Sequence, residues 1–249
     1  MSKKVFNFYS RFYDMLNSNK DYVAEVDYIV SLLEKSCLKG KNLLEFGSGT
    51  GKHGNLLAKK GYSVIGVEKS SEMISQSEQS ERFQTKIGDI RSINLDRNFD
   101  AVLSLFHVMS YQSSNQTLLA TFLNASNHMT SGGLFIFDVW YSPAVYKQRP
   151  VVRVKYFNDE VFNLTRIAEP VIYNDKNIVD VNYRIIAENL ENGELHTVSE
   201  THRMRHFSLP ELDLLAEFTG FERIKAEEFL TGNSPSDNTW GVCLVFKKI

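Results

Sequence analysis

The chain of 249 residues has little cysteine, no long apolar run and no excess of charge of either sign. Its two cysteines, Cys37 and Cys243, lie in apolar segments, and no C-x-x-C pair is present, so we expect reduced, buried thiols. The first residues, MSKKVFNFYSRFYD, contain no continuous apolar stretch, and no segment approaches the length of a membrane span. We therefore expect a soluble cytoplasmic protein with no membrane partner.

The charged residues also exclude one class of partner. The chain has 28 basic and 30 acidic residues, a net charge of −2, and these residues are distributed without long runs. A protein that binds nucleic acid through a strong basic field needs a clear excess of Lys and Arg. We expect no nucleic-acid partner. The length and the 43% hydrophobic content fit one large globular domain, or one domain with an insert.

Short apolar runs alternate with helical patterns over the first 140 residues. The pattern predicts strands over 41–46, 62–68, 83–89, 99–106 and 133–140, and helices over 21–37, 52–60, 71–80 and 115–129. Ser70 is the expected cap of the third of these helices. Nearly continuous apolar strands separated by helices indicate a parallel sheet that is covered on both faces.

The pattern changes after Pro143. Residues 178–186, IVDVNYRII, alternate apolar and polar side chains as a strand does, and Asn192-Gly193 is typical of a hairpin turn. The α/β pattern resumes at Ser208-Leu209-Pro210-Glu211, a capping-box start of a helix that ends at Gly220. Strands over 221–229 and 240–248 complete the chain. We expect a core of residues 1–140 and 206–249, with an antiparallel insert over 141–205.

The segment NLLEFGSGTGKHG places three glycines, at 47, 49 and 51, directly after a strand. This G-x-G-x-G spacing matches neither the dinucleotide fingerprint nor the Walker phosphate loop. Glu45 stands two residues before the first glycine, where it would repel a pyrophosphate and attract a cation. Glu68 ends the next strand and can accept hydrogen bonds from both hydroxyls of a ribose. A ligand with a ribose and a cationic, phosphate-free tail, such as S-adenosylmethionine, fits both acids.

Several segments in order resemble the class I S-adenosylmethionine-dependent methyltransferases. LLEFGSGTGKHGNLLAKKG resembles their first motif, VIGVEKSSEMI the acidic second motif and IGDIRSI the turn beside the adenine. FDAVLSLFHVMSY and GGLFIFDVW resemble their fourth and fifth strands, and the similarity covers roughly 8–140 and 206–249. The resemblance implies a seven-stranded Rossmann-like sheet with helices on both faces, an enzyme, and S-adenosylmethionine as its cofactor.

The resemblance also implies cofactor contacts, one residue at a time. Glu45, Gly47 and Gly49 would frame the methionine part, with the Leu105 carbonyl facing its amino group and Tyr22 reaching its carboxylate. Glu68 would bind the ribose. The adenine would lie near Met73, with Asp89 at its amino group and the Ile90 backbone at a ring nitrogen. Met73 and Ile90 could equally be plain core residues.

Within this superfamily the chain is most similar to the N-methyltransferases that dimethylate nucleotide-linked amino sugars. The similarity rests on the antiparallel insert and on the segments FYDML, NKDYVAEVDYI, GDIRSINLDRNFDAV, DVWYSP and THRMRHFSLPEL. TGNSPSDNTWG departs from the Gly/Ser/Arg-rich turn of that family. The resemblance implies that Tyr13 and Tyr111 flank the reacting amine, and that Trp140, Tyr141, His202 and Arg203 bind the substrate. The oligomeric state is left open, with a homodimer as one option.

Other interpretations of these residues remain open. His107 could be the base in place of Tyr111, and a tight pair of His107 with an acid would favour hydroxyl acceptors. Tyr13 could serve only in an aromatic cluster with Phe6, Phe8, Tyr9 and Phe12. His196, His202 and His206 share one strand parity, yet no carboxylate stands at a recognisable ligand spacing, so we expect no metal.

The methyl acceptor is also not settled by the sequence. The Asn/Asp-Pro-Pro-aromatic motif of adenine methylation is absent after the fourth strand, where the chain reads LFHVMSYQ. The first hypothesis is N-methylation of a small amine, most of all of a nucleotide-linked amino sugar. The alternatives are O- or N-methylation of another small metabolite, such as a glycine-type amine, and a cofactor-binding regulatory module without activity.

Overall fold

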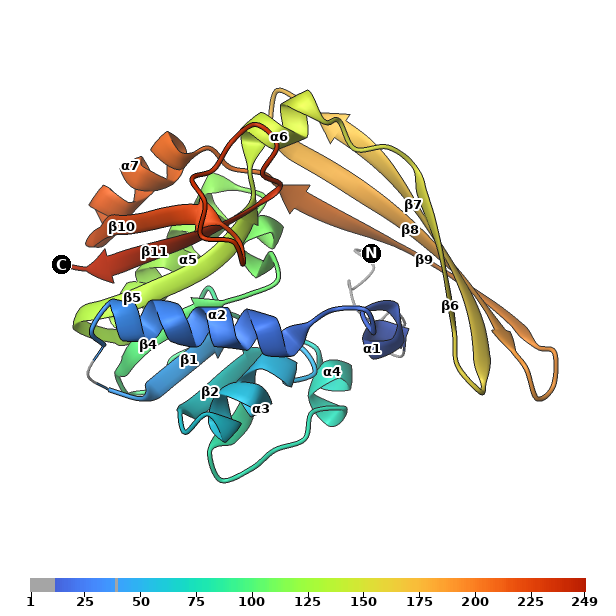
Figure 1. Cartoon of the computed structure of the whole chain (residues 1–249), viewed down its shortest axis with the longest axis horizontal. Helices are drawn as coiled ribbons and strands as arrows, with labels where there is room; N and C mark the ends of the chain where they lie inside the picture. Colours follow the sequence, from blue (N-terminus) through green and yellow to red (C-terminus); the bar gives the residue numbers. More distant parts are fainter. Residues whose placement is uncertain (1–11, 39) are drawn as a thin grey trace.

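The computed structural model describes residues 12–38 and 40–249, so the start of the resemblance at residue 8 and the aromatic residues Phe6, Phe8 and Tyr9 lie outside it. Its core is a seven-stranded sheet in the order β10-β11-β5-β4-β1-β2-β3 (Figure 1). The strands are β1 Asn42–Phe46, β2 Ser63–Glu68, β3 Phe83–Ile87, β4 Phe99–Ser104, β5 Met129–Trp140, β10 Phe221–Glu228 and β11 Gly241–Lys248. β11 is antiparallel to both of its neighbours, whereas β1 to β5 are parallel.

Helices cover both faces of this core sheet, as the apolar strands predict. Helices α2 (Tyr22–Lys35) and α3 (Lys52–Lys59) bury their apolar stripes on one face, and α5 (Asn115–Asn127) and α7 (Leu209–Thr219) on the other. Neighbouring residues of one strand enter different clusters: Leu43 packs beneath α2, and Leu44 packs with α5. Both are fully buried, which explains why the strand has no polar alternation.

Local signals at the helix ends were only partly correct. Ser70 caps α4, since its Oγ accepts a hydrogen bond from Met73 N at 3.2 Å, and Gly220 ends α7 at a φ of +78°. The helix expected over 71–80 stops at Ser75, because the polar residues that follow have no apolar stripe to bury. The capping box at Ser208 is also wrong: its side chain makes no cap hydrogen bond. Glu211 instead pairs with Arg205.

A second, antiparallel sheet projects from the core, with α1 (Tyr13–Leu16) beside it (Figure 1). We call it the insert sheet; it consists of β6 Arg153–Asn158, β7 Phe162–Tyr173, β8 Ile178–Asn189 and β9 Leu195–Arg205, in sequence order. Gly193 has a φ of +71° at the hairpin tip, as the Asn-Gly pair predicts. Leu16 of α1 and Phe12, which directly precedes this helix, pack on Phe157, Leu164 and Ile185 of the insert sheet.

The chain enters the insert through a short helix that the sequence pattern did not indicate, α6 (Ser142–Lys147). The returning chain pairs with the end of β5, where Phe207 N donates to the Trp140 carbonyl at 2.9 Å and Ser142 N donates to the Phe207 carbonyl at 2.8 Å. His206 is fully buried at this junction and bonds Ser142 Oγ through Nδ1 at 2.8 Å. The insert sheet is therefore tied to the core by both of its connections.

Two further expectations can be compared with the structure. Cys243 is buried in the core, but Cys37 is exposed just after α2, so the prediction of two buried thiols was wrong for Cys37. The apolar residues before Cys37 belong to the helix, and the chain turns outward once the helix has ended. Within the described part of the chain, no helix is both long and apolar enough to cross a membrane.

Candidate active site

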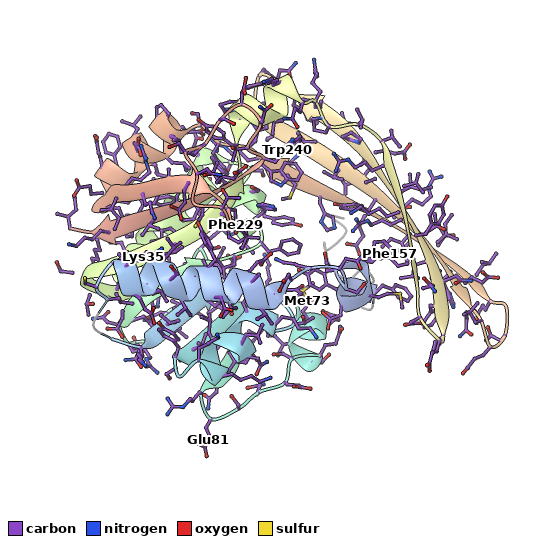
Figure 2. The ribbon with its side chains drawn as sticks, in the orientation of Figure 1. Lys35, Met73, Glu81, Phe157, Phe229 and Trp240 are labelled. Carbon is purple, nitrogen blue, oxygen red and sulfur yellow. The ribbon has the colours of Figure 1, made fainter. Side chains whose placement is uncertain are left out.

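A pocket of about 1130 Å³ lies between the carboxyl ends of the core strands and the inner face of the insert sheet. Open α/β sheets bind ligands at this end of their strands. Figure 2 shows Met73 on the core side of this region and Phe157 on the insert side, and both residues line the pocket. Its volume exceeds the range of about 300–1,000 Å³ that is typical of ligand sites, which leaves space for a cofactor and an acceptor together.

The glycine turn forms the floor of the pocket. Gly47 has a φ of +71°, and a Cβ added there would lie 2.6 Å from Cγ1 of Val108, so both the conformation and the space require glycine. Gly49 N donates to Oε2 of Glu68 at 3.0 Å. Oε1 of Glu68 accepts hydrogen bonds from the backbone N–H groups of Lys69 and Ser70 at 2.7 and 2.8 Å. Glu68 is thus held in one orientation beside the turn.

Asp89, which is expected at the adenine, already accepts hydrogen bonds from the side chains of Arg91 and Lys69. Arg91 Nε donates to Oδ1 at 2.7 Å, Arg91 Nη2 contacts Oδ2, and Lys69 Nζ lies 3.2 Å from Oδ2. These hydrogen bonds, led by that of Arg91, hold the pKa of Asp89 far below its usual range. With the Arg91 N–H as well, the four acceptor sites of the carboxylate are filled. An adenine amino group would have to displace the exposed Lys69.

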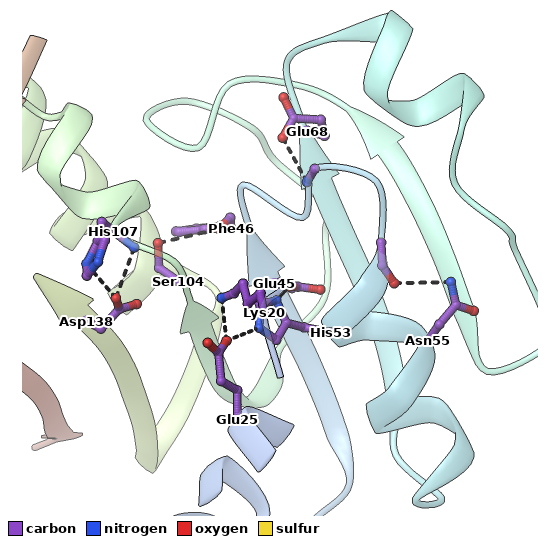
Figure 3. A network of polar contacts seen from close by, with 12 residues as sticks. Lys20, Glu25, Glu45, Phe46, His53, Asn55, Glu68, Ser104, His107 and Asp138 are labelled. Carbon is purple, nitrogen blue, oxygen red and sulfur yellow. Dashed lines mark hydrogen bonds and ion pairs between the residues drawn. The ribbon is translucent and has the colours of Figure 1, made fainter. Parts of the chain in front are cut away.

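A buried network of charges lies behind the methionine end expected for the cofactor (Figure 3). Lys20 Nζ lies 2.5 Å from Oε2 of Glu25, and the same oxygen lies 2.7 Å from Nε2 of His53. Burial lowers the pKa of both Lys20 and His53. Burial alone would raise the pKa of Glu25, but its hydrogen bonds with His53 and Lys20 lower it overall. Sequence reasoning missed Lys20 and Glu25, because the family resemblance of their segment assigned neither of them a role.

Glu45 is buried beneath the glycine turn and is not among the residues that line the pocket. Its Oε1 lies 3.8 Å from His53 Nδ1, and no described residue gives its Oε2 a hydrogen bond. Burial, with the negative charge of Glu68, raises the pKa of Glu45 to about 8. The carboxyl is therefore protonated at neutral pH in this structure, rather than presented as an anion to the pocket.

His107 and Asp138 form a tight pair at the end of β4 and β5. Nδ1 of His107 lies 2.6 Å from Oδ2 of Asp138, and the His107 backbone N–H donates to the same oxygen at 3.1 Å (Figure 3). Burial works to raise the pKa of Asp138, but the contacts with His107 lower it overall. Phe106 and His107 both have positive φ, at 63° and 60°, a strained backbone that is characteristic of functional sites. Asp138 was another residue that the sequence did not single out.

Tyr111 and His202 meet across the pocket. Tyr111 lies in the short helix η2 (Val108–Tyr111), and its Oη is 2.8 Å from His202 Nδ1 on β9. Tyr13 lines the same pocket from α1. The core and the insert sheet thus join their polar groups over the space where an acceptor would bind.

Most of the residues named from the sequence line this pocket, and three do not. Those that line it are Tyr13, Tyr22, Gly47, Gly49, Glu68, Met73, Asp89, Ile90, Leu105, His107, Tyr111, Trp140 and His202. Besides Glu45, the exceptions are Tyr141, which packs against the core, and Arg203. Arg203 pairs with Asp180 on the opposite face of the insert sheet from His202, so the structure does not bring it to the pocket. Adjacent strand residues point to opposite faces, which the motif alone could not reveal.

The insert sheet gives the pocket a cationic wall. Arg153 and Lys155 of β6 and Arg166 of β7 line it, and Lys155 is the register partner of Arg166. Among the described residues, neither Arg153 nor Lys155 forms an ion pair with a carboxylate within 4.0 Å. Over the described residues no group of His, Cys, Asp and Glu is arranged to hold a metal ion.

Comparisons with known proteins agree with this geometry. A family model described as a methyltransferase domain matches residues 43–133. The chain is 30% identical over 139 residues to the dTDP-3-amino-3,4,6-trideoxy-alpha-D-glucopyranose N,N-dimethyltransferase of Streptomyces venezuelae, which is 55% of this chain and 58% of that protein. The match thus spans somewhat more than half the length of this relative.

Two further similarities extend over nearly the whole chain. The putative methyltransferase YqeM of Bacillus subtilis (strain 168) is 26% identical over 240 residues, 93% of this chain and 92% of that protein. The sugar N-methyltransferase KedS8 from Streptoalloteichus sp. ATCC 53650 superposes with a TM-score of 0.81 at 18% identity, over 98% of this chain and 95% of that one. At this identity the superposition establishes the fold.

Proposed function

We propose that the chain is a class I S-adenosylmethionine-dependent methyltransferase and that it methylates the amino group of a sugar carried on a nucleotide. The observation that carries the acceptor is the cationic wall at the insert end of the pocket, which Arg153 and Lys155 line. The core end carries both signs, since the cations Lys20 and Lys69 line it beside the acids Glu68 and Asp138. The diphosphate of a nucleotide suits the insert end, and the acids of the core end suit a cationic cofactor.

The residues at the core end fit S-adenosylmethionine. The turn at Gly47 and Gly49 leaves room for close approach, and no Walker-type lysine is present to hold a phosphate. Glu68, which lines the pocket, is held beside the turn by hydrogen bonds from the backbone N–H groups of Gly49 and Ser70. The cofactor supplies a methyl group on a positively charged sulfur. Glu68 would hold its ribose, Met73 and Ile90 would contact its adenine, and Tyr22 would reach its carboxylate.

The chain itself contributes alignment and a dry environment. Methyl transfer is an in-line displacement, so holding the acceptor nitrogen at a fixed place accounts for a large part of the rate. In this proposal Tyr111 and Tyr13 flank the amine, and Trp140 lines the pocket beside them. The amine must be neutral when it attacks, whereas alkyl amines are mostly protonated at neutral pH. The polar groups around Tyr111 therefore also have to remove a proton.

One observation favours a second candidate, methylation of a hydroxyl group. A hydroxyl acceptor needs a stronger base than an amine does, and a histidine oriented by a buried carboxylate is a recurrent solution. The contact of 2.6 Å between His107 Nδ1 and Asp138 Oδ2 is such an arrangement, and His107 lines the pocket. The relative from Streptomyces venezuelae is named for N,N-dimethylation, and the charge of the two pocket ends suits both acceptors equally.

A methyl-transfer assay read by mass spectrometry tests both candidates. The panel pairs nucleotide-linked 3- and 4-amino sugars with their hydroxyl analogues, and it includes glycine and simple polyamines. The first proposal expects one and two methyl units on an amino sugar, with a loss of about 10²-fold in kcat for Tyr111→Phe. Transfer to the hydroxyl analogue that is abolished in His107→Asn would replace it by the second. Bound cofactor without turnover on any acceptor would favour a regulatory module.

A further inference from the structure

Glu200, His202 and Tyr111 form a polar chain from the insert sheet to the core side of the pocket. His202 Nδ1 lies 2.8 Å from Tyr111 Oη, and His202 Nε2 lies 3.5 Å from Oε2 of Glu200. Glu200 and His202 are two residues apart on β9, so both side chains face the pocket side of the insert sheet. Both side chains are almost completely buried, with exposures of 8% and 4%.

We propose that this chain carries the proton of the acceptor ammonium away through Tyr111, so that the insert sheet supplies the positioning residues His202 and Glu200 for the reaction. The proposal rests on the proposed function of the same pocket. It changes the expected role of His202, from a substrate contact to the group behind Tyr111. It also gives the insert sheet a part in the chemistry, beyond closing the pocket.

The proton transfer balances without any further reactant. The ammonium group of the acceptor gives one proton to Tyr111 Oη, while the Tyr111 hydroxyl proton passes to Nδ1 of His202. The acceptor becomes a neutral amine with a free lone pair, Tyr111 remains neutral, and the imidazole becomes an imidazolium. After each methyl transfer the imidazolium releases its proton to solvent. Because methyl transfer to the neutral amine leaves a methylammonium, which must lose a proton before it can attack again, dimethylation uses the relay twice.

The surroundings of His202 set the direction of the hydrogen bond. Nε2 faces the Glu200 carboxylate, which favours a proton on that nitrogen and leaves Nδ1 to accept from the Tyr111 hydroxyl. At 3.5 Å the contact with Glu200 is an ion-pair separation and not a short hydrogen bond, so Glu200 acts mainly through its charge. Tyr183 of β8 packs edge-on against His202, with ring centroids 4.9 Å apart, and Arg166 of β7 stands over Tyr183.

The same strand region contains a matched comparison. Glu194 and His196 repeat the Glu-x-His spacing at the hairpin end, and their Oε1 and Nε2 atoms are also 3.5 Å apart. Their side chains are 60% and 34% exposed, and neither lines the pocket. Screening by water makes such an exposed pair weak. The two pairs therefore share sequence spacing and distance, and they differ in burial and in contact with Tyr111.

The first test observes the tautomer of His202 directly, without substrate. In protein with ¹⁵N-labelled histidine, the His202 ring is assigned through the His202→Asn variant. We expect Nδ1 unprotonated and Nε2 protonated, and we expect Tyr111→Phe to shift the Nδ1 signal. A protonated Nδ1 that donates to Tyr111 would overturn the relay. This result holds whether or not the acceptor has been identified.

The second test is the pH–rate profile with an amino-sugar acceptor. Glu200→Gln keeps the shape of the side chain and removes the charge that favours the imidazolium. We expect the acid limb of kcat to move to lower pH and the plateau to fall about tenfold or more, since proton transfer contributes about 10²–10⁴-fold in enzymes. Glu194→Gln, the matched control, is expected to leave both unchanged. Tyr111→Phe should regain activity at high pH, where more of the acceptor is neutral.

The outcomes separate the two proposals. If the wild-type protein methylates an amine and Glu200→Gln lowers kcat without moving the acid limb, the role of Glu200 is structural and the relay fails. If the wild-type protein methylates no amine, the proposed function fails, and the tautomer of His202 still decides whether the relay is assembled. A fall of kcat with unchanged KM, together with the moved limb, supports the relay.

Discussion

The two sheets meet at one pocket, but they contribute opposite properties to it. The core sheet is covered by helices on both faces and presents acids and a glycine turn whose geometry is fixed by close contacts, such as that between Gly47 and Val108. Among the described elements, α1, α6 and η2 pack on the insert sheet, which presents the exposed cations Arg153 and Lys155. The comparison leads to a division of labour within the proposed function, in which the core holds the cofactor and the insert selects the acceptor.

The largest expected difference comes from two glycines with the same backbone angle. Gly47 and Gly193 both have a φ of +71°, but a Cβ at Gly47 would lie 2.6 Å from Val108, whereas nothing lies within 4 Å of one at Gly193. In both variants to alanine the left-handed backbone should cost about 1–2 kcal/mol of unfolding free energy. Only Gly47→Ala should also weaken cofactor binding, by more than about tenfold, or about 1.4 kcal/mol.

Calorimetric titration with S-adenosylmethionine and urea unfolding of both variants measure these two quantities. Equal cofactor affinities in Gly47→Ala and Gly193→Ala would show that the glycine turn is not part of the cofactor-binding site. A loss of cofactor affinity in Gly193→Ala would contradict the division of labour between the two sheets, because that glycine lies at the far tip of the insert.

The cations of the insert sheet are expected to act on the acceptor alone. Replacing Arg153 and Lys155 together by Gln should raise the KM of a nucleotide-linked acceptor about five- to tenfold. This increase is smaller than for two buried cations, because both side chains are exposed and water screens their charges. The dissociation constant of the cofactor should not change. Arg184→Gln, on the same sheet but outside the pocket, is the matched control. An unchanged KM in the double variant would argue against a diphosphate at this wall.

The last comparison concerns Glu45, whose pKa of about 8 lies above its usual value of 4.5 because of burial and the charge of Glu68. The unfolded chain loses this proton near pH 4.5, whereas the folded protein keeps it until about pH 8. The contribution of Glu45 to stability is therefore fully present below pH 4.5 and is lost as the pH rises toward 8. Urea unfolding at several pH values should show Glu45→Gln gaining stability relative to the wild type as the pH rises.

The exposed Glu194→Gln variant of the insert hairpin provides the contrast for this series. Its difference in unfolding free energy from the wild type should stay constant over the same pH range, because water screens the charge. A constant difference for Glu45→Gln as well would mean that the Glu45 carboxyl ionises in the folded protein as it does in solution.

The fold was predictable because its signals are local. Apolar runs such as those around Leu44 and Val102 are continuous only when both faces of a strand are buried, and this pattern led to the parallel sheet. The predicted cofactor contacts followed from ordered motifs at strand ends. An error arose where the local signal and the packing disagreed. The helix after Ser70 was expected to extend to residue 80, but the residues after Ser75 are polar and have no apolar face to bury, so the helix ends there.

The site was predictable only in part, because its charges come from distant segments. Lys20 and Glu25 precede the first strand and Asp138 lies near the end of the fifth, and the family resemblance assigned no role to any of them. The pair of His107 and Asp138 joins residues that are 31 apart, and that of Tyr111 and His202 joins residues 91 apart. Arg203 carried a family resemblance, but the parity of β9 turned it away from the pocket.

By itself the sequence determined the class of fold, the glycine turn and the position of the insert, because each depends on neighbouring residues and on the period of apolar side chains. The tertiary structure alone decided which charges face each other. In the folded protein Glu45 is buried, and the Asp89 carboxylate accepts hydrogen bonds from Arg91. The Glu-x-His pair at 200 and 202 lies against Tyr111, whereas the pair with the same spacing at 194 and 196 is exposed to water. The strength of the interaction between two charges depends on their distance and their burial, and neither quantity can be read from the spacing of residues in the sequence.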